Sequence, residues 1–199
     1  NRKDYGTYPY GAIISAHTKR NLVAFICEND WFIVSYNQPY SKVDPATGYL
    51  KTNPGGLSAP QQKTGDIFGC SPQDTGTVII DDQFFFWLDS KNTGWIKCDY
   101  QNATDISQQN EQRGERGGIQ SYLNAKIEFI EKWNYTHELK DRFDKVAGID
   151  SERGNVYLTF RPRRNNTNNI YSYVTGRRNI SLGYQETVVY NVQYRAWIP

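Results

Sequence analysis

The two histidines and three cysteines are the first residues to consider as metal ligands or catalysts. His17 and His137 lie far apart in the chain, and neither has a cysteine or second histidine at the spacing of a zinc site. Cys27, Cys70 and Cys98 form no C-x-x-C pair, so we expect buried, reduced thiols rather than a zinc knuckle or a redox dithiol. We expect both histidines to be surface or core residues. The sequence therefore predicts no metal site and no cofactor.

Carboxylates are the next candidates, because a glycosidase-type hydrolase needs two of them facing one bond. Asp81, Asp82 and Asp89 are available, but nothing in their spacing pairs them, and Asp in a hairpin turn bonds its own backbone. EF-hand spacing, the G-x-S-x-G nucleophile motif and the phosphate-binding loop motif are all absent from the sequence. We predict that the protein is not an enzyme and rank a hydrolase last.

Arginines gather in two neighbouring segments near the C-terminus. They are Arg161, Arg163, Arg164, Arg177 and Arg178. Clustered arginines are typical of phosphate contact, and also of a solvated loop between strands. The formal net charge of +2 does not by itself indicate nucleic-acid binding. We favour a solvated loop for these side chains, and the alternative is that they lie at an interface or face DNA.

Aromatic residues make up 15% of the chain, including 15 Tyr and 5 Trp. Enrichment of this kind favours strands over helices. Exposed aromatic rings can also form a carbohydrate platform, for which the candidates are Trp31, Trp87, Trp95, Trp133 and Trp197. Aromatic side chains in β-rich domains are usually core or interface residues, so we favour a core role for them.

Short β-rich runs separated by tight polar turns recur along the chain. The runs are residues 22–27, 31–36, 77–80, 84–88, 95–100, 146–160 divided at 151–154, and 186–199 divided at 191–194. Gly154 can supply the positive φ that a tight hairpin turn needs. Four strands in up-and-down order form one propeller blade or one small meander. The sequence predicts a mainly β fold of antiparallel four-stranded meanders, a partial β-propeller, with one short helix.

The helix is predicted from one apolar face, formed by Ile119, Tyr122, Leu123, Ile127 and Ile130. Residues 38–65 are rich in proline and glycine and are expected to form a loop. We predict two regions. Residues 1–65 carry an N-terminal hairpin and the Pro/Gly-rich loop, and residues 66–199 carry propeller-like blades with a helical insertion near 118–133.

The chain contains no methionine and starts at Asn1, from which we expect a processed or excised piece of a longer protein. A blade-forming piece would depend on neighbouring repeats to bury its faces. No apolar run has the length of a membrane span, so we expect none.

The order of several segments resembles a known family. They are residues 68–72, 78–89, Gly94-Trp-Ile-Lys97, 105–107, 118–123, 146–160 and 186–190, followed by Trp197. Over residues 66–199 this order resembles the propeller-bearing tail proteins of short-tailed bacteriophages, especially the large stabilisation or tail nozzle (muzzle) proteins of crAss-like gut phages. The excursion at 161–184 departs from a compact blade.

The resemblance implies a structural virion protein that helps to form the genome exit channel, with no catalytic residues. Its partners would be copies of itself in a cyclic oligomer and other phage tail proteins, with transient contact to genomic DNA. It would be synthesised in the host cytoplasm and reside in the virion tail. The alternative from a different class is a host-surface carbohydrate-binding module that uses exposed Trp and Tyr side chains.

Overall fold

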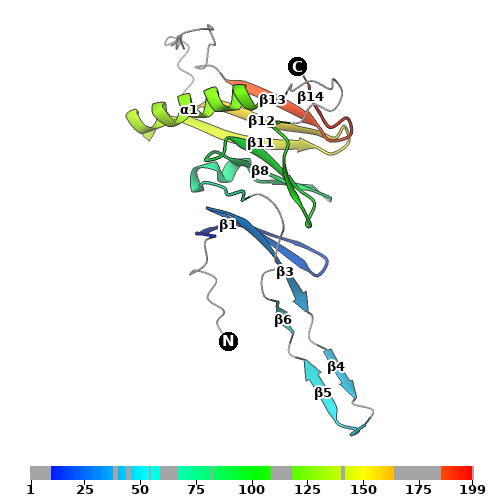
Figure 1. The fold of residues 1–199 in the computed structure, drawn as a ribbon. Coiled ribbons are helices and arrows are strands. Elements are labelled where there is room, and N and C mark those ends of the chain that lie inside the picture. The colour runs from blue at the N-terminus through cyan, green and yellow to red at the C-terminus, as the bar shows by residue number, and fades with distance from the viewer. Residues whose placement is uncertain are drawn as a thin grey trace.

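The structure is a computed structural model that describes residues 10–37, 40–43, 46–53, 55–58, 67–81, 83–108, 118–139, 142–163 and 185–198. Within these residues the fold is mainly β, with three four-stranded antiparallel sheets, a separate two-stranded hairpin and one α-helix (Figure 1). The predicted mainly β fold of antiparallel four-stranded meanders with one short helix is confirmed.

Sheet 1 contains the first predicted hairpin. Its strands are β1 (Ile13–Lys19), β2 (Leu22–Cys27), β3 (Trp31–Asn37) and β6 (Gly56–Leu57). Strands β2 and β3 pair so that Ala24 lies opposite Ile33, which places their apolar side chains together on one face of the sheet. Strand β1 was not predicted, because the polar residues that follow Ile14 hide its pattern. It nevertheless pairs with β2 along nearly its whole length.

Sheet 2 lies in the middle of the fold. It follows the 3-10 helix η2 (Pro72–Thr77) and consists of β7 (Ile79–Ile80), β8 (Phe85–Asp89), β9 (Gly94–Cys98) and β10 (Ala103–Asp105). Every residue of β8 is buried. Successive side chains of a strand point to opposite faces of its sheet. Both faces of sheet 2 are covered by other parts of the protein. Strand β8 is therefore mostly an apolar run, and not an alternation of apolar and polar residues.

Sheet 3 follows the helix and forms a regular meander. The elements are α1 (Gln120–Thr136), β11 (Phe143–Asp150), β12 (Asn155–Pro162), β13 (Glu186–Asn191) and β14 (Ala196–Ile198). The predicted short helix is confirmed, and Leu123, Ile127 and Ile130 form its buried face. The alternate residues Val156, Leu158 and Phe160 of β12 are fully buried and meet this face of the helix.

The three sheets pack face to face in the order of the chain. One hydrophobic cluster joins Ile26 and Trp31 of sheet 1 to Phe85 and Trp87 of sheet 2. A second cluster joins the other face of sheet 2, at Phe86, to sheet 3 and α1. Sheet 2 is therefore the central layer (Figure 1). The predicted division at residue 65 stays a prediction, and residues from both sides of it share the first cluster.

The prediction that residues 38–65 form a loop is wrong over part of its length. Strands β4 (Tyr40–Val43) and β5 (Leu50–Asn53) pair as a second hairpin, which we call the arm, and β6 joins sheet 1. Gly48, at a φ of +67°, lies in the connection between the two strands, so here glycine allows a hairpin to turn. The arm projects away from the stacked sheets (Figure 1).

Candidate functional site

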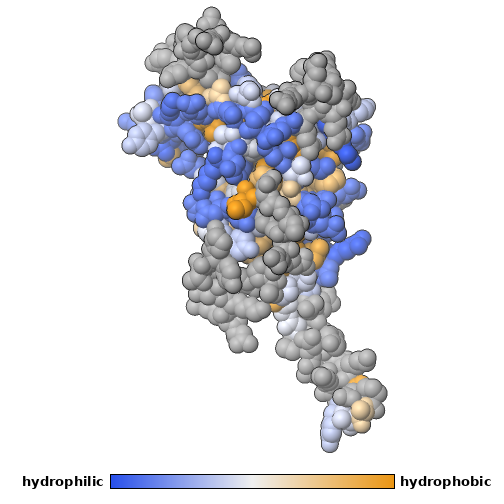
Figure 2. Space-filling view, viewed as in Figure 1, coloured by the Kyte–Doolittle hydropathy of each residue, from blue (hydrophilic) through white to orange (hydrophobic). Residues whose placement is uncertain are grey.

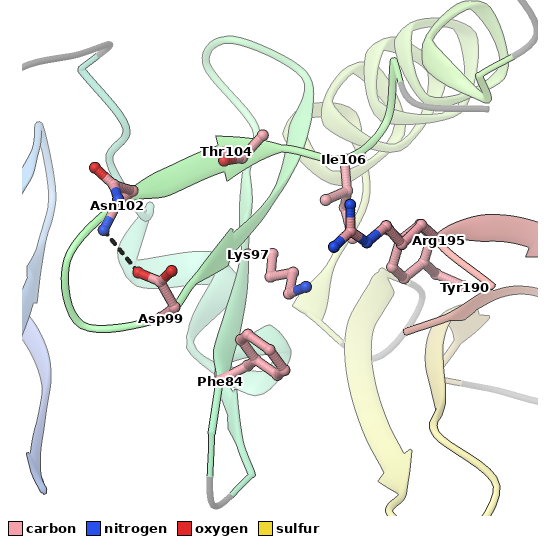
Figure 3. Close-up of a pocket in the computed structure, with 8 residues that line it drawn as sticks. All are labelled: Phe84, Lys97, Asp99, Asn102, Thr104, Ile106, Tyr190 and Arg195. Atoms are coloured by element: carbon pink, nitrogen blue, oxygen red, sulfur yellow. Dashed lines mark hydrogen bonds between the residues drawn. The ribbon is translucent and has the colours of Figure 1, made fainter. Parts of the chain in front are cut away.

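A groove opens between sheet 2 and the turn that joins β13 to β14. Its cavity of about 170 Å³ is lined by Phe84, Lys97, Asp99, Asn102, Thr104, Ile106, Tyr190 and Arg195 (Figure 3). In sheet 2 the lining residues belong to strands β9 and β10 and to the segments next to the strands. In sheet 3 they belong to the end of β13 and the turn that follows it. The groove is thus the polar edge of the interface between these two sheets.

Lys97 is placed in the groove by the alternation of β9. It pairs across the sheet with Phe86 on one side and Thr104 on the other, so its side chain lies on the face of sheet 2 that meets sheet 3. Its ammonium lies 3.9 Å from the centroid of the Phe84 ring. At this distance the ring face attracts the cation and holds the flexible side chain in place.

Arg195 reaches the groove from the turn after β13. Its φ of +47° is a left-handed conformation that L-residues other than glycine adopt at a cost. The turn is fixed on one side by the Tyr194 amide, which donates to Asn191 Oδ1 at 2.9 Å, and on the other by the pairing of Asn191 with Ala196. Figure 3 shows the Lys97 ammonium and the Arg195 guanidinium pointing into the same space.

The groove is rich in hydrogen-bond donors. Besides the two cations it offers the Thr104 hydroxyl and the Asn102 amide. Asp99 is the acidic lining residue, and its Oδ1 already accepts the backbone N–H groups of Gln101 at 2.9 Å and of Asn102 at 2.8 Å. Lys97 and Arg195 lie in the same groove, and Asp99 already accepts two backbone hydrogen bonds. The groove therefore has the charged donors that an anion site needs.

The two described arginines of the set predicted at an interface or facing DNA lie away from the groove. Arg161 is exposed at the end of β12. Arg163 Nε donates to Asp144 Oδ1 at 2.7 Å and its Nη1 donates to the Leu139 carbonyl at 3.3 Å, so this side chain braces the start of β11. Arg164, Arg177 and Arg178 lie outside the described residues.

Strand pairing separates these arginines from the groove. Phe160 lies opposite Glu186 and Asn155 lies opposite Asn191, so Arg161 and Arg195 are at opposite ends of sheet 3. The structure therefore does not bring Arg161 or Arg163 together with Arg195. One feature of the sequence pointed to the groove, namely Lys97 within the otherwise apolar strand β9. No feature of the sequence pointed to Arg195.

The histidines have local structural partners. The Nε2 atom of His17 lies 2.8 Å from Ser15 Oγ, and partial burial lowers the pKa of His17. The His137 ring stacks on Trp133, with ring centroids 3.7 Å apart. Within the described ranges, no three His, Cys, Asp or Glu side chains gather in a way that could hold a metal ion.

The candidate carboxylates that the structure describes accept hydrogen bonds from the backbone and from side chains in turns. Asp89 is buried and accepts hydrogen bonds from the Gly69 amide at 3.0 Å and from Asn92 Nδ2 at 2.8 Å. Asp81 Oδ1 accepts the Ser151 hydroxyl at 3.0 Å, which ties two turns together. Asp82 lies outside the described residues.

All three cysteines are buried, reduced thiols, as the sequence predicted. Burial, reinforced by the nearby carboxylates of Asp74 and Asp89, raises the pKa of the Cys70 thiol to about 12. The thiolate is the reactive form of cysteine, so Cys70 is chemically quiet at neutral pH.

The tryptophans are core or packed residues. Trp31, Trp87 and Trp95 are at most 3% exposed, so these three are unable to present a carbohydrate platform. Trp133 is covered on one face by His137, and Trp197 packs on Trp95 with ring centroids 5.5 Å apart. The favoured core role is confirmed for the first three.

Sequence reasoning missed two buried lysines, each held by a carboxylate. Lys126 of α1 is fully buried, with Nζ 2.7 Å from Glu186 Oε2, and the Tyr122 hydroxyl donates to the same oxygen at 2.7 Å. Burial lowers the pKa of Lys126, whereas Glu186 acts in the opposite direction. Lys145 Nζ lies 2.6 Å from Asp74 Oδ1. These pairs join α1 to β13 and β11 to η2.

Comparison with known proteins identifies no family for the chain. It matches no family model, and no curated protein or solved structure is significantly similar to it. Within the part of the chain described by the structure, no helix has the length and apolar character needed to cross a membrane.

Proposed function

We propose that the chain is a structural virion protein, part of a phage tail nozzle or muzzle, and that it acts by assembling around the genome exit channel. The observation that carries this proposal is the packing of three successive four-stranded antiparallel meanders, face to face and in chain order. Successive meanders packed in this way are the arrangement expected of β-propeller blades. The segment order that resembles crAss-like phage nozzle proteins points to the same class.

The arm supports a role in assembly. Its two strands pair with each other and with no other described strand, and an isolated two-stranded hairpin is marginally stable in water. Val43 and Tyr49, near its far end, are 56% and 79% exposed. Figure 2 shows hydrophobic atoms at that end of the arm, beyond a largely hydrophilic body. A hairpin of this kind gains stability by docking on a neighbouring copy in a cyclic oligomer.

Arg161 is the described arginine that best suits the predicted interface or DNA-facing role, because its side chain is exposed whereas Arg163 braces β11. The alternative, a carbohydrate-binding module, has weaker support because Trp31, Trp87 and Trp95 are buried. Its remaining candidates are scattered exposed tyrosines such as Tyr135 and Tyr194.

Sedimentation of the intact chain against a variant with residues 40–53 replaced by a Gly-Ser linker tests the assembly role. We expect the intact chain to form a closed oligomer and the variant to be a folded monomer. A second variant, Val43→Ser combined with Tyr49→Ser, keeps the hairpin and removes its two exposed apolar side chains. It should also weaken assembly. An intact chain that stays monomeric at every soluble concentration would contradict self-assembly.

A further inference from the structure

We propose that the groove between sheet 2 and the β13–β14 turn binds a phosphate group. Lys97 and Arg195 come from different sheets, yet their charged ends share one small space (Figure 3). Each of these cations can donate a charge-assisted hydrogen bond to an anion that enters this space. This site is separate from the proposed tail function, and either can fail without the other.

The size of the groove limits what it can hold. Pockets for drug-sized ligands measure roughly 300–1,000 Å³, whereas this cavity measures about 170 Å³. The space therefore suits a single anionic group rather than a whole nucleotide or an oligosaccharide. An attached chain would leave the groove through its open side.

The direction of the donors favours phosphate over carboxylate. Lys97 lies on one wall of the groove and Arg195 on the opposite corner. A carboxylate presents two coplanar oxygens, which one guanidinium fork can satisfy alone. A tetrahedral phosphate presents oxygens in several directions and can accept hydrogen bonds from both cations.

Apolar lining strengthens the interaction. Ile106 and Tyr190 are each 1% exposed and close the inner side of the groove, and the Phe84 ring lies against Lys97. Charges next to such surfaces are less screened by water than charges on an open surface. The phosphate can be free or part of a nucleic-acid backbone, and the experiment separates these two sources.

The test is a titration of the full isotope-labelled chain with inorganic phosphate, followed by NMR at constant ionic strength. We expect saturable shifts centred on the amides of β9, β10 and the β13–β14 turn. Lys97→Gln should weaken phosphate binding by about tenfold or more, because it removes a charge-assisted hydrogen bond. Arg195→Asn, a second variant at an exposed turn where Asn tolerates the positive φ, should do the same.

Lys132→Gln is the matched control, because it also removes one positive charge but lies on the exposed side of α1, with a side chain 65% exposed. Its phosphate affinity should be unchanged. Equal weakening by all three variants, a shift that never saturates, or equal binding of acetate would each overturn the proposal. If phosphate binds, its displacement by a short DNA duplex assigns a nucleic-acid backbone as the source, and no displacement assigns free phosphate.

Discussion

At the scale of single residues, the segment 68–72 closes the first two sheets against each other. Gly69 donates its amide to Asp89 Oδ2 at 3.0 Å and accepts the Trp87 indole N–H at 3.0 Å. The backbone of Glu28 passes so close that a Cβ on Gly69 would lie 2.3 Å from the Glu28 carbonyl oxygen. Only glycine fits at this crossing, which gives a physical role to one of the segments that carry the family resemblance.

Gly69→Ala should therefore destabilise the fold by about 1–3 kcal/mol, the usual cost of overpacking a well-packed site. Urea denaturation measures the loss. The control is Gly148→Ala in β11, where a new Cβ meets nothing within 4 Å and should change stability little. Equal effects of the two substitutions would contradict the close approach at Gly69.

The buried pair of Lys145 and Asp74 makes a second prediction. Lys145 Nζ also donates to Ser90 Oγ at 2.8 Å, and both charged side chains are at most 3% exposed. Lys145→Met should cost about 3–5 kcal/mol, because it leaves the Asp74 carboxylate buried without its cation. Adding Asp74→Leu should restore part of that loss. Lys132→Met, at an exposed pair, should have little effect in the same denaturation experiment.

The raised pKa of Cys70 predicts a loss of stability in alkaline solution. The folded thiol keeps its proton up to about pH 12, whereas a thiol with the ordinary pKa of 9.0 loses it earlier. Its contribution is therefore complete below pH 9 and falls as the pH rises toward 12. Burial also raises the pKa values of Tyr100 and Tyr122, which act in the same direction at higher pH.

Denaturation curves recorded at several pH values above 8 check this. Cys70→Ala should lower stability at neutral pH but lose less with rising pH than the unchanged chain. Cys98→Ala is the control, since Cys98 is another buried thiol. A pH dependence identical in the Cys70 variant and the unchanged chain would show that this thiol is not responsible.

At the scale of elements, α1 covers the second hydrophobic cluster, the one that joins sheet 2 to sheet 3. Ile127 is 1% exposed and packs among Leu123, Phe160 and their neighbours. Ile127→Ala should cost about 2–5 kcal/mol through the cavity that it leaves. Glu131→Ala, on the exposed side of the same helix, should be nearly neutral. A small loss for Ile127→Ala in thermal or urea unfolding would mean that the helix is not part of the core.

The elements also show how far the sequence could be interpreted. Strands with dense aromatic or aliphatic runs, such as β8 and β12, and the apolar face of α1 were predicted because periodicity reports burial directly. Strand β1 was missed because His17 and Lys19 interrupt its pattern, and the arm was missed because glycine and proline were interpreted as loop formers. The groove could not be predicted, since Lys97 and Arg195 meet only through the packing of two sheets.

At the scale of the whole molecule, the stack of meanders supports the proposal of a structural role. Each inner face is covered by the next sheet, and two hydrophobic clusters hold the three layers together. The groove lies between sheets 2 and 3, whereas the arm follows β3 of sheet 1, so phosphate binding and assembly can be tested independently.

The proposal places the gene for the chain in a phage genome, and its most direct test is cryo-electron microscopy of that phage's purified virions, with peptide mapping of the same particles. The proposal predicts peptides of this chain in the virion, and density for its three stacked sheets in a ring of identical copies around the tail channel. Virions that are intact and infectious but contain no copy of the chain would contradict it.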